Sequence, residues 1–158
     1  MMKSSVAVML LCASTCSGQL TPINSDAAFE SGIISSTRCW AVLFVSSHRD
    51  VAAATEMVSK LGAMMPGLSL ASADVDEVKA ISSEFNVRKR MVPRLLIFSS
   101  RARQADIIKL KAEAGTELSF DEVAKMVRNS LAENSKDADG NYEKLTLAIG
   151  GAEDKAEL

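Results

Sequence analysis

Three kinds of residue are scarce in this chain of 158 residues. It contains one histidine and three cysteines, and aromatic side chains make up only 4% of it. A zinc site needs three or four histidine, cysteine or carboxylate ligands, so this set argues against one. Scarce aromatics and a net charge of −2 argue against nucleic-acid binding, which depends on basic surfaces and stacking. We therefore expect no nucleic-acid partner, no metal and no cofactor.

Long apolar runs are also missing. A short one lies near the N-terminus, at residues 6–13, after Lys3 and before small residues that end at Gly18. A transmembrane helix needs roughly 20 apolar residues, so this run is too short to span a membrane. The arrangement is typical of a secretory signal peptide, which we assign to residues 1–18. A buried N-terminal helix is the alternative. After signal removal we expect no stable membrane insertion.

The few cysteines limit the thiol chemistry that is available. Cys12 and Cys16 lie within the predicted signal peptide, so Cys39 alone would remain in the mature chain. Cys39 begins an apolar stretch at residues 39–45. We favour a buried, inert thiol at this position over one that forms a mixed disulfide with a partner.

Strand and helix patterns alternate through the rest of the chain. The apolar run at residues 39–45 is typical of a central strand covered on both faces. We expect Gly62 to end one helix, and a capping box of Ser119 and Glu122 to begin the last one. The expected order is a strand or linker at 21–24, a helix at 27–34, a strand at 39–45, a helix at 51–61, a strand at 68–75, a helix at 77–85, strands at 94–99 and 105–110, and a helix at 120–131. This order predicts a single α/β domain with a mixed central sheet flanked by helices.

One motif is more specific than the general pattern. The chain reads FNV at residues 85–87 and MVPRLLIF at residues 91–98, so a proline directly precedes an apolar strand. Proline lacks a backbone N–H and therefore suits the first residue of a strand. Together with ADVDE at residues 73–77 and the element order, this string resembles the second half of a thioredoxin-like domain. The resemblance covers residues 20–132 and implies a cis proline beside the family's active site.

The same resemblance shows that a motif typical of thioredoxins is absent from this chain. Thioredoxins carry Cys-x-x-Cys after a strand, and alignment on Phe44 puts Arg49 and Ala52 at those two positions. Disulfide exchange needs a reactive thiolate and a resolving thiol, which neither residue supplies. Cys39 lies roughly 25–30 Å from this loop at about 3.3 Å per residue. The chain thus resembles the non-catalytic domains of the protein disulfide isomerase family.

Residues 88–111 form a strongly basic segment. They contain one acid, Asp106, and eight basic residues: Arg88, Lys89, Arg90, Arg94, Arg101, Arg103, Lys109 and Lys111. The resemblance places part of this segment beside the proline, in a groove where the family lays an extended polypeptide. The residues expected to line the groove are His48, Arg49, Val92, Pro93 and Arg94. A peptide with acidic residues would suit such a groove. A solvated basic loop, balanced by the acidic C-terminal segment, is the alternative.

The C-terminal residues 133–158 differ in composition from the rest. They are polar and acidic, with little apolar surface to bury, so we predict a flexible acidic tail. The chain ends in KAEL at residues 155–158, which resembles the KDEL signal for retrieval to the endoplasmic reticulum. With the predicted signal peptide, this indicates the secretory pathway. The protein would stay in the endoplasmic reticulum lumen if KAEL acts as a retrieval signal, and be secreted otherwise.

These features together predict a redox-inactive, thioredoxin-like luminal protein that binds unfolded or partner polypeptides. Two alternatives stay open. The first is an enzyme that assists disulfide isomerisation through Cys39 or with a catalytic partner. The second is a structural domain that serves as a scaffold.

Overall fold

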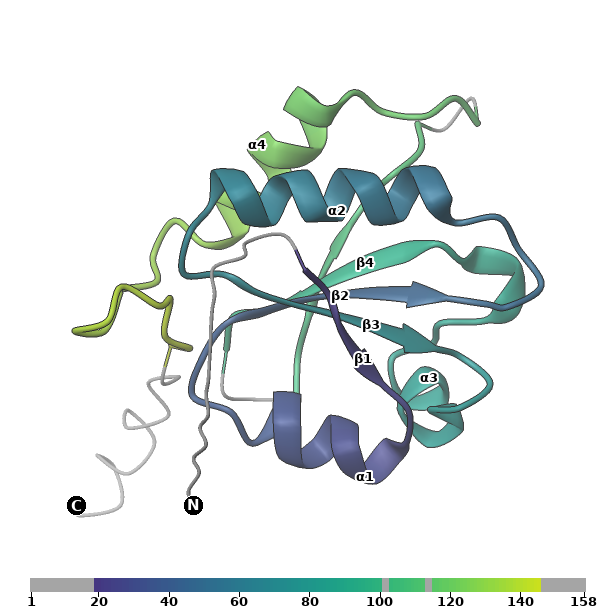
Figure 1. Cartoon of the computed structure of the whole chain (residues 1–158), viewed down its shortest axis with the longest axis horizontal. Helices are drawn as coiled ribbons and strands as arrows, with labels where there is room; N and C mark the ends of the chain where they lie inside the picture. Colours follow the sequence, from purple (N-terminus) through teal and green to yellow (C-terminus); the bar gives the residue numbers. More distant parts are fainter. Residues whose placement is uncertain (1–18, 101–102, 113–114, 146–158) are drawn as a thin grey trace, which may run out of the picture.

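A five-stranded mixed sheet forms the centre of the computed structural model, which describes residues 19–100, 103–112 and 115–145 (Figure 1). The strands lie in the order β1 (Thr21–Ile23), β3 (Ser69–Asp74), β2 (Trp40–Val45), β4 (Arg94–Phe98) and β5 (Asp106–Ile108). The first three are parallel to one another, and β4 runs antiparallel to both of its neighbours. The predicted α/β fold with a mixed sheet is confirmed.

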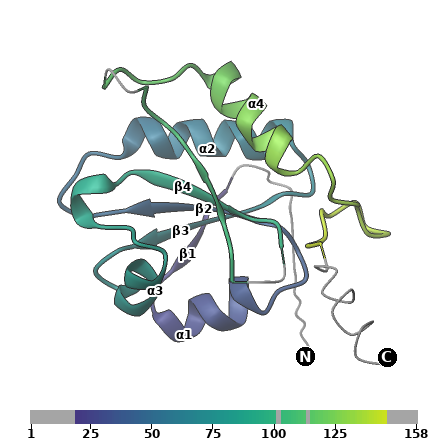
Figure 2. The same cartoon turned by 180° about the vertical axis from the view of Figure 1, so that it is seen from behind.

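Helices cover both faces of this sheet. One face carries α2 (Ala52–Met64) and α4 (Phe120–Ser130), and the view from behind shows α4 crossing α2 (Figure 2). The other face carries α1 (Asp26–Phe29), the π-helix η1 (Glu30–Ile34) and α3 (Lys79–Glu84). A 3-10 turn, η2 (Lys89–Met91), leads into β4. No helix in the described part of the chain has the length and hydrophobicity to cross a membrane.

The central strands are apolar at successive positions because both of their faces are buried. In β2, Ala41 and Leu43 pack with residues of α2 and α4, whereas Val42 and Phe44 pack with residues of α1 and α3. The residues of β4 alternate between the same two clusters. The prediction of a central strand covered on both faces is therefore confirmed. Removal of these side chains from water stabilises the fold on both sides of the sheet.

The helix ends follow the sequence signals only in part. The capping box is present: Ser119 Oγ accepts a hydrogen bond from the Glu122 N–H, and the Glu122 carboxylate accepts one from the Ser119 N–H. The prediction that Gly62 ends α2 is wrong, since the helix continues to Met64. Gly62 is buried within the helix beside Leu61, so tertiary packing outweighs its low helix propensity.

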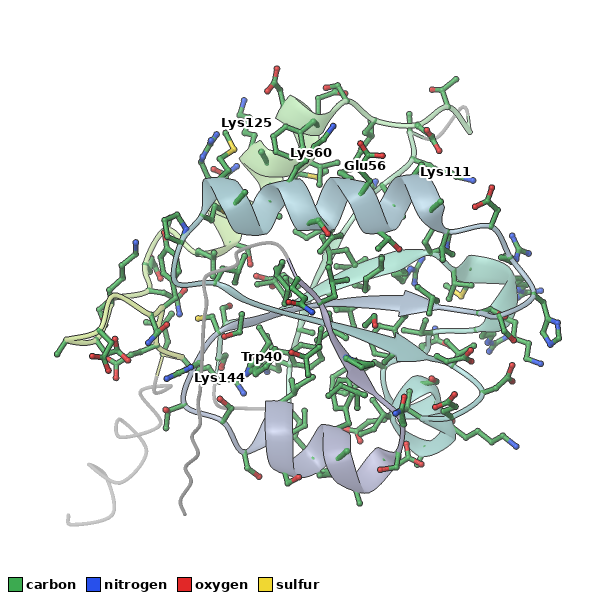
Figure 3. All side chains as sticks on the ribbon, viewed as in Figure 1. Trp40, Glu56, Lys60, Lys111, Lys125 and Lys144 are labelled. Carbon is green, nitrogen blue, oxygen red and sulfur yellow. The ribbon has the colours of Figure 1, made fainter. Side chains whose placement is uncertain are left out.

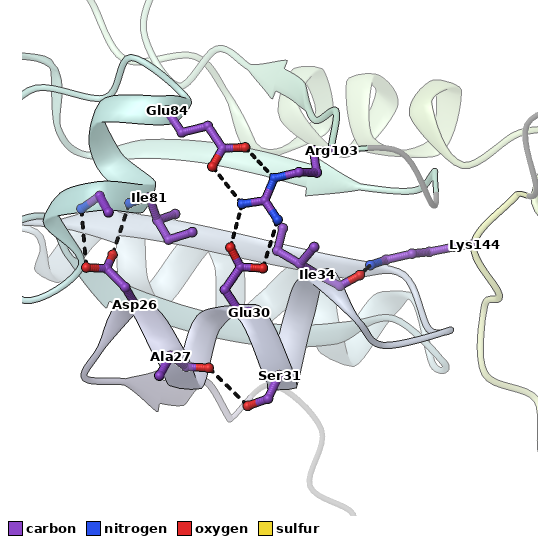
Figure 4. A network of polar contacts seen from close by, with 10 residues as sticks. Asp26, Ala27, Glu30, Ser31, Ile34, Ile81, Glu84, Arg103 and Lys144 are labelled. Atoms are coloured by element: carbon purple, nitrogen blue, oxygen red, sulfur yellow. Dashed lines mark hydrogen bonds and ion pairs between the residues drawn. The ribbon is translucent and has the colours of Figure 1, made fainter.

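The first turn of α3 is capped from a distant element. The predicted helix begins at residue 77, but the structure begins it at Lys79. The Asp74 carboxylate accepts the Asp76 N–H at 2.8 Å and holds the preceding residues in a turn. The Asp26 carboxylate accepts the N–H groups of Ala80 and Ile81, which links α1 to α3 (Figure 4).

The segment after α4 departs most from the prediction. We expected a flexible tail from residue 133, but residues 134–145 are hydrogen-bonded across one end of the sheet, and we call them the strap. The Cys39 N–H donates to Tyr142 O, the Lys144 N–H to Thr37 O and the Leu145 N–H to Ser99 O. Composition does not predict this, because long-range hydrogen bonds, together with Tyr142 packed against the core, hold the strap in place. The rest of the predicted tail, the KAEL terminus and the predicted signal peptide lie outside the described residues.

Lys144 anchors the strap under η1. Its side chain is buried, and its ammonium donates to the backbone oxygens of Ile33 at 2.5 Å and Ile34 at 3.1 Å (Figure 4). A buried charge is tolerated only when it is well hydrogen-bonded, and the carbonyls at the end of η1 supply these bonds.

Candidate functional site

The loop between β2 and α2 is a tight polar turn. Ser46 is buried, and its hydroxyl accepts the His48 N–H at 3.3 Å. The Ser46 carbonyl accepts the Arg49 N–H at 3.0 Å. Asp50 then accepts the N–H of Ala52 at the start of α2. These bonds leave the side chains of His48 and Arg49 exposed, and the loop contains no thiol.

Cys39 lies at the other end of β2. Its side chain is fully buried, donates to Glu143 O at 3.4 Å and accepts from Asn134 Nδ2 at 3.3 Å. Burial raises the pKa of the thiol to about 11, against a smaller opposing effect of the Lys144 charge. The thiol is therefore protonated near neutral pH, whereas nucleophilic attack needs the thiolate. The prediction of a buried thiol is confirmed.

Pro93 marks the opposite end of the sheet from Cys39. The Val92–Pro93 peptide bond is cis. If the pairing of Leu95 with Ile108 is continued along the ladder, Pro93 falls level with Leu110. The Val92 side chain is buried, but its backbone N–H and C=O have no hydrogen-bond partner among the residues that the structure describes. A free donor and acceptor on one residue can pair with an extended polypeptide.

A small apolar hollow, which we call the proline hollow, lies against Pro93 on the face covered by α2. Its volume is about 30 Å³, and it is lined by Ala53, Ala54, Met57, Pro93, Leu110, Lys111 and Glu117. An adjoining hollow of about 200 Å³ shares Ala53 and Met57 and continues to Phe120. Figure 3 shows Glu56 and Lys60 on α2, with Lys111 near the first turn of this helix. The two hollows follow α2 from Ala53 to Lys60, and the second has the charged residues Glu56 and Lys60 in its lining as well as apolar side chains.

A further hollow, which we call the basic hollow, adjoins the proline hollow. It measures about 150 Å³ and is lined by Met91, Pro93, Arg94, Ile107, Ile108, Lys109, Leu110 and Lys111. Ile108 and Leu110 pack under α2 and α4. Strand alternation places Ile107 and Lys109 on the opposite face of the strand, where Ile107 is 51% exposed.

Most cations around Pro93 have no acidic partner. Lys89 pairs with Asp76 at 2.9 Å, and Arg103 pairs with Glu30 and Glu84. In the described ranges, no ion pair involves Arg49, Arg88, Arg90, Arg94, Lys109 or Lys111. Arg101 lies outside the described residues. The end of the sheet that carries Pro93 therefore presents several cations that form no ion pair with another described residue.

The structure brings together only part of the predicted site. Pro93 and Arg94 line the hollows described above, and Val92 contributes its backbone while its side chain is buried. His48 and Arg49 are exposed on the neighbouring loop and line none of these three hollows.

Sequence reasoning missed the apolar lining of the site. Met57 and Leu110 come from elements distant in the chain and meet Pro93 only in the fold. A register for the last two strands would have found Leu110, since it follows from the pairing of Leu95 with Ile108. The sequence gives no comparable signal for Met57, whose spacing in α2 is typical of an ordinary core position.

Comparison with known proteins identifies the fold. No protein-family model matches the sequence, and no curated protein matches it. A similar solved structure is thioredoxin from Trypanosoma brucei brucei, 15% identical, with a TM-score of 0.55 over 73% of this chain and 94% of that chain. Another is a mutant thioredoxin from Halobacterium salinarum NRC-1, 18% identical, with a TM-score of 0.54 over 74% of this chain and 95% of that chain. At these identities the similarity shows the fold alone, so the chain has a thioredoxin-like fold.

Proposed function

We propose that this chain is a redox-inactive, thioredoxin-like protein that binds extended polypeptides beside Pro93. The observation that carries the proposal is the unpaired backbone of Val92 next to the proline hollow. A bound strand would pair with the Val92 N–H and C=O while the tip of an apolar side chain enters the hollow. His48 and Arg49 would contact the strand from the neighbouring loop.

The redox-inactive part of the proposal is supported by the positions of the cysteines. Residues 46–54, which form the loop after β2 and the first turn of α2, contain no cysteine. Cys39 is buried at the far end of β2, and its raised pKa keeps it protonated at neutral pH. These facts favour binding over the alternative of an enzyme acting through Cys39. Resemblance to the non-catalytic domains of the protein disulfide isomerase family agrees with a role in assisting protein folding.

A location in the lumen of the secretory pathway is part of this proposal. It is supported by the signal-like residues 1–18 and by the KAEL terminus, both of which are sequence features. Deletion of Leu158 tests retention by KAEL. We expect the deletion to increase the amount of protein secreted into the culture medium, and equal secretion with and without Leu158 would contradict retention.

Calorimetry with an unfolded client tests the binding function. The client is reduced, carboxymethylated α-lactalbumin, titrated into the full chain. Ala53→Gln places a longer neutral side chain in the proline hollow, and Ala63→Gln makes the same change at an exposed position near the far end of α2. We expect Ala53→Gln to weaken binding about fivefold or more and Ala63→Gln to leave it unchanged.

An insulin-reduction assay on the same samples tests redox inactivity. We expect the rate with the full chain to equal the rate without protein. Turnover of insulin would contradict redox inactivity. Absence of client binding, or equal binding by the Ala53→Gln and Ala63→Gln variants, would contradict the proposal that polypeptides bind beside Pro93.

A further inference from the structure

We infer that the polypeptide bound beside Pro93 carries acidic residues next to its apolar anchor, and that the basic hollow binds these acids. This inference rests on the proposed function, because it names the class of polypeptide that the same site selects. It goes further by assigning the two parts of the ligand to two separate hollows.

The two hollows share lining residues but differ in charge. They share Pro93, Leu110 and Lys111, so one extended segment can contact both. The proline hollow has Glu117 as well as Lys111 in its lining, and its charges balance. The basic hollow adds Arg94 and Lys109 and has no acid in its lining.

Arg94 and Lys109 have no acidic neighbour in the lining of the basic hollow, whereas Lys111 lies opposite Glu117 in an isolated β-bridge. Arg94, Lys109 and Lys111 take part in none of the ion pairs among the described residues. The nearby acid on β5, Asp106, instead accepts the Ser130 hydroxyl of α4 at 2.5 Å. Asp106 therefore faces α4, on the opposite side of the strand from Lys109. A carboxylate of a ligand would meet free guanidinium and ammonium donors, which bind carboxylates through charge-assisted hydrogen bonds.

The apolar part of the same surface favours a polypeptide over a small anion. Ile107 is 51% exposed and is one of two large apolar side chains that are exposed among the described residues. It lies in the lining of the basic hollow with Met91. A ligand with both carboxylates and apolar side chains covers this mixed surface, whereas a free anion would leave Ile107 in water. An acidic, partly apolar peptide segment is therefore the occupant that fits.

Fluorescence anisotropy with three synthetic peptides tests this assignment. The peptides have equal length and the same Leu-Val anchor, which is flanked by glutamate, by glutamine or by lysine. For the full chain we expect the glutamate peptide to bind about three- to tenfold more tightly than the glutamine peptide, with the lysine peptide weakest. Added salt should reduce this preference.

Matched charge variants locate the preference. The Arg94→Gln, Lys109→Gln double variant should lose it and still bind the glutamine peptide. The Arg94→Lys, Lys109→Arg variant retains both charges and should retain the preference. The control variant Lys79→Gln, Lys125→Gln removes one exposed cation from α3 and one from α4, and neither takes part in an ion pair among the described residues. This control should not change the preference for the glutamate peptide.

The outcomes separate the inference from the function on which it rests. Equal binding of all three peptides, or a preference that survives Arg94→Gln, Lys109→Gln, would overturn the inference and leave polypeptide binding in place. Failure of every peptide to bind the full chain would overturn both. The unfolding midpoint of each variant is measured first, so that binding is compared only between folded proteins.

Discussion

The two ends of the central sheet have opposite characters. At the cysteine end, which comprises Cys39, Ser99 and the strap, many polar groups are hydrogen-bonded, although Asn134 Oδ1 is buried without a partner among the described residues. Asn134 alone donates to Ser99 O, Glu143 O and Cys39 Sγ. At the proline end, which comprises the β2–α2 loop, η2 and Pro93, the Val92 backbone is unpaired among the described residues and most of the cations form no ion pair there. In Figure 1 the strap lies on the left and the proline end on the right.

This difference indicates which end of the sheet contributes most to the stability of the fold and which end is available to bind a ligand. Hydrogen bonds between buried polar groups, such as those donated by Asn134 Nδ2 and Lys144 Nζ, fix a structure, and the loss of one partner destabilises it. Unpaired backbone groups and uncompensated charges contribute little to stability but are available to a ligand. The one thiol in the described residues lies at the cysteine end, whereas the unpaired Val92 backbone and the cations without an ion pair lie at the proline end. The comparison predicts large stability effects at the first and small ones at the second.

The largest expected effect is at Lys144. Lys144→Met removes the ammonium that donates to Ile33 O and Ile34 O beneath η1. Loss of a charged donor from buried carbonyls should lower the free energy of unfolding by about 3 kcal/mol, measured by urea denaturation. The control Lys125→Met, at an exposed position on α4, should change it by less than about 0.5 kcal/mol. Equal effects of the two changes would mean that the strap is not a stabilising element.

The next effect is a pH dependence from Cys39. Burial raises the pKa of its thiol from 9.0 to about 11. The pKa of the thiol is higher in the folded state than in the unfolded state. The contribution of the buried, protonated thiol to the free energy of unfolding is therefore complete below pH 9 and is lost as the pH rises from 9 to 11. We expect the wild-type chain to lose about 2 kcal/mol more than Cys39→Ala over this range. Superimposable pH profiles of the two proteins would contradict a buried thiol.

A smaller effect is expected at Arg103, in the loop between β4 and β5. Its guanidinium bonds to both Glu30 and Glu84, at 2.6–2.8 Å (Figure 4). These bonds lower the pKa of both carboxyls below 4.5. The stabilisation is thus present above pH 4.5 and is lost as the pH falls below it. Melting temperatures should fall less between pH 7 and pH 3 in Arg103→Gln than in the wild type, while Arg88→Gln follows the wild type.

The smallest stability effect is expected at the proline end. Arg94→Gln with Lys109→Gln removes two charges that form no ion pair in the described structure. The free energy of unfolding should change by less than about 0.5 kcal/mol in urea denaturation. A loss as large as that of Lys144→Met would show that these charges serve the fold, and the contrast between the two ends would fail.

Local signals in the sequence predicted much of the fold. The apolar run at residues 39–45 indicated a strand buried on both faces, and Ser119 with Glu122 indicated the start of α4, because each depends on neighbours along the chain. The strap was mispredicted since its stability comes from contacts more than 90 residues away in sequence, such as Asn134 with Cys39. Composition alone records no such contact.

The candidate site was less predictable than the fold. Pro93 and Arg94 followed from the resemblance to thioredoxin-like domains, which rests partly on the proline before an apolar strand. The apolar lining did not, because Met57 and Leu110 approach Pro93 only when α2 and β5 are in place. The sequence also could not predict that the Val92 backbone is unpaired. That property depends on the hydrogen bonds that neighbouring residues make in the fold, which no local motif specifies.

The measurement that tests the central claim most directly is an NMR titration of the full chain with the glutamate-flanked peptide. The account predicts amide shift changes at Val92, Arg94 and Lys109, with a hydrogen-bonded shift for the Val92 N–H. It also predicts no change at Cys39, Asn134 and Lys144, at the other end of the sheet. Shift changes confined to the cysteine end, or a Val92 amide that is unaffected at saturation, would contradict it.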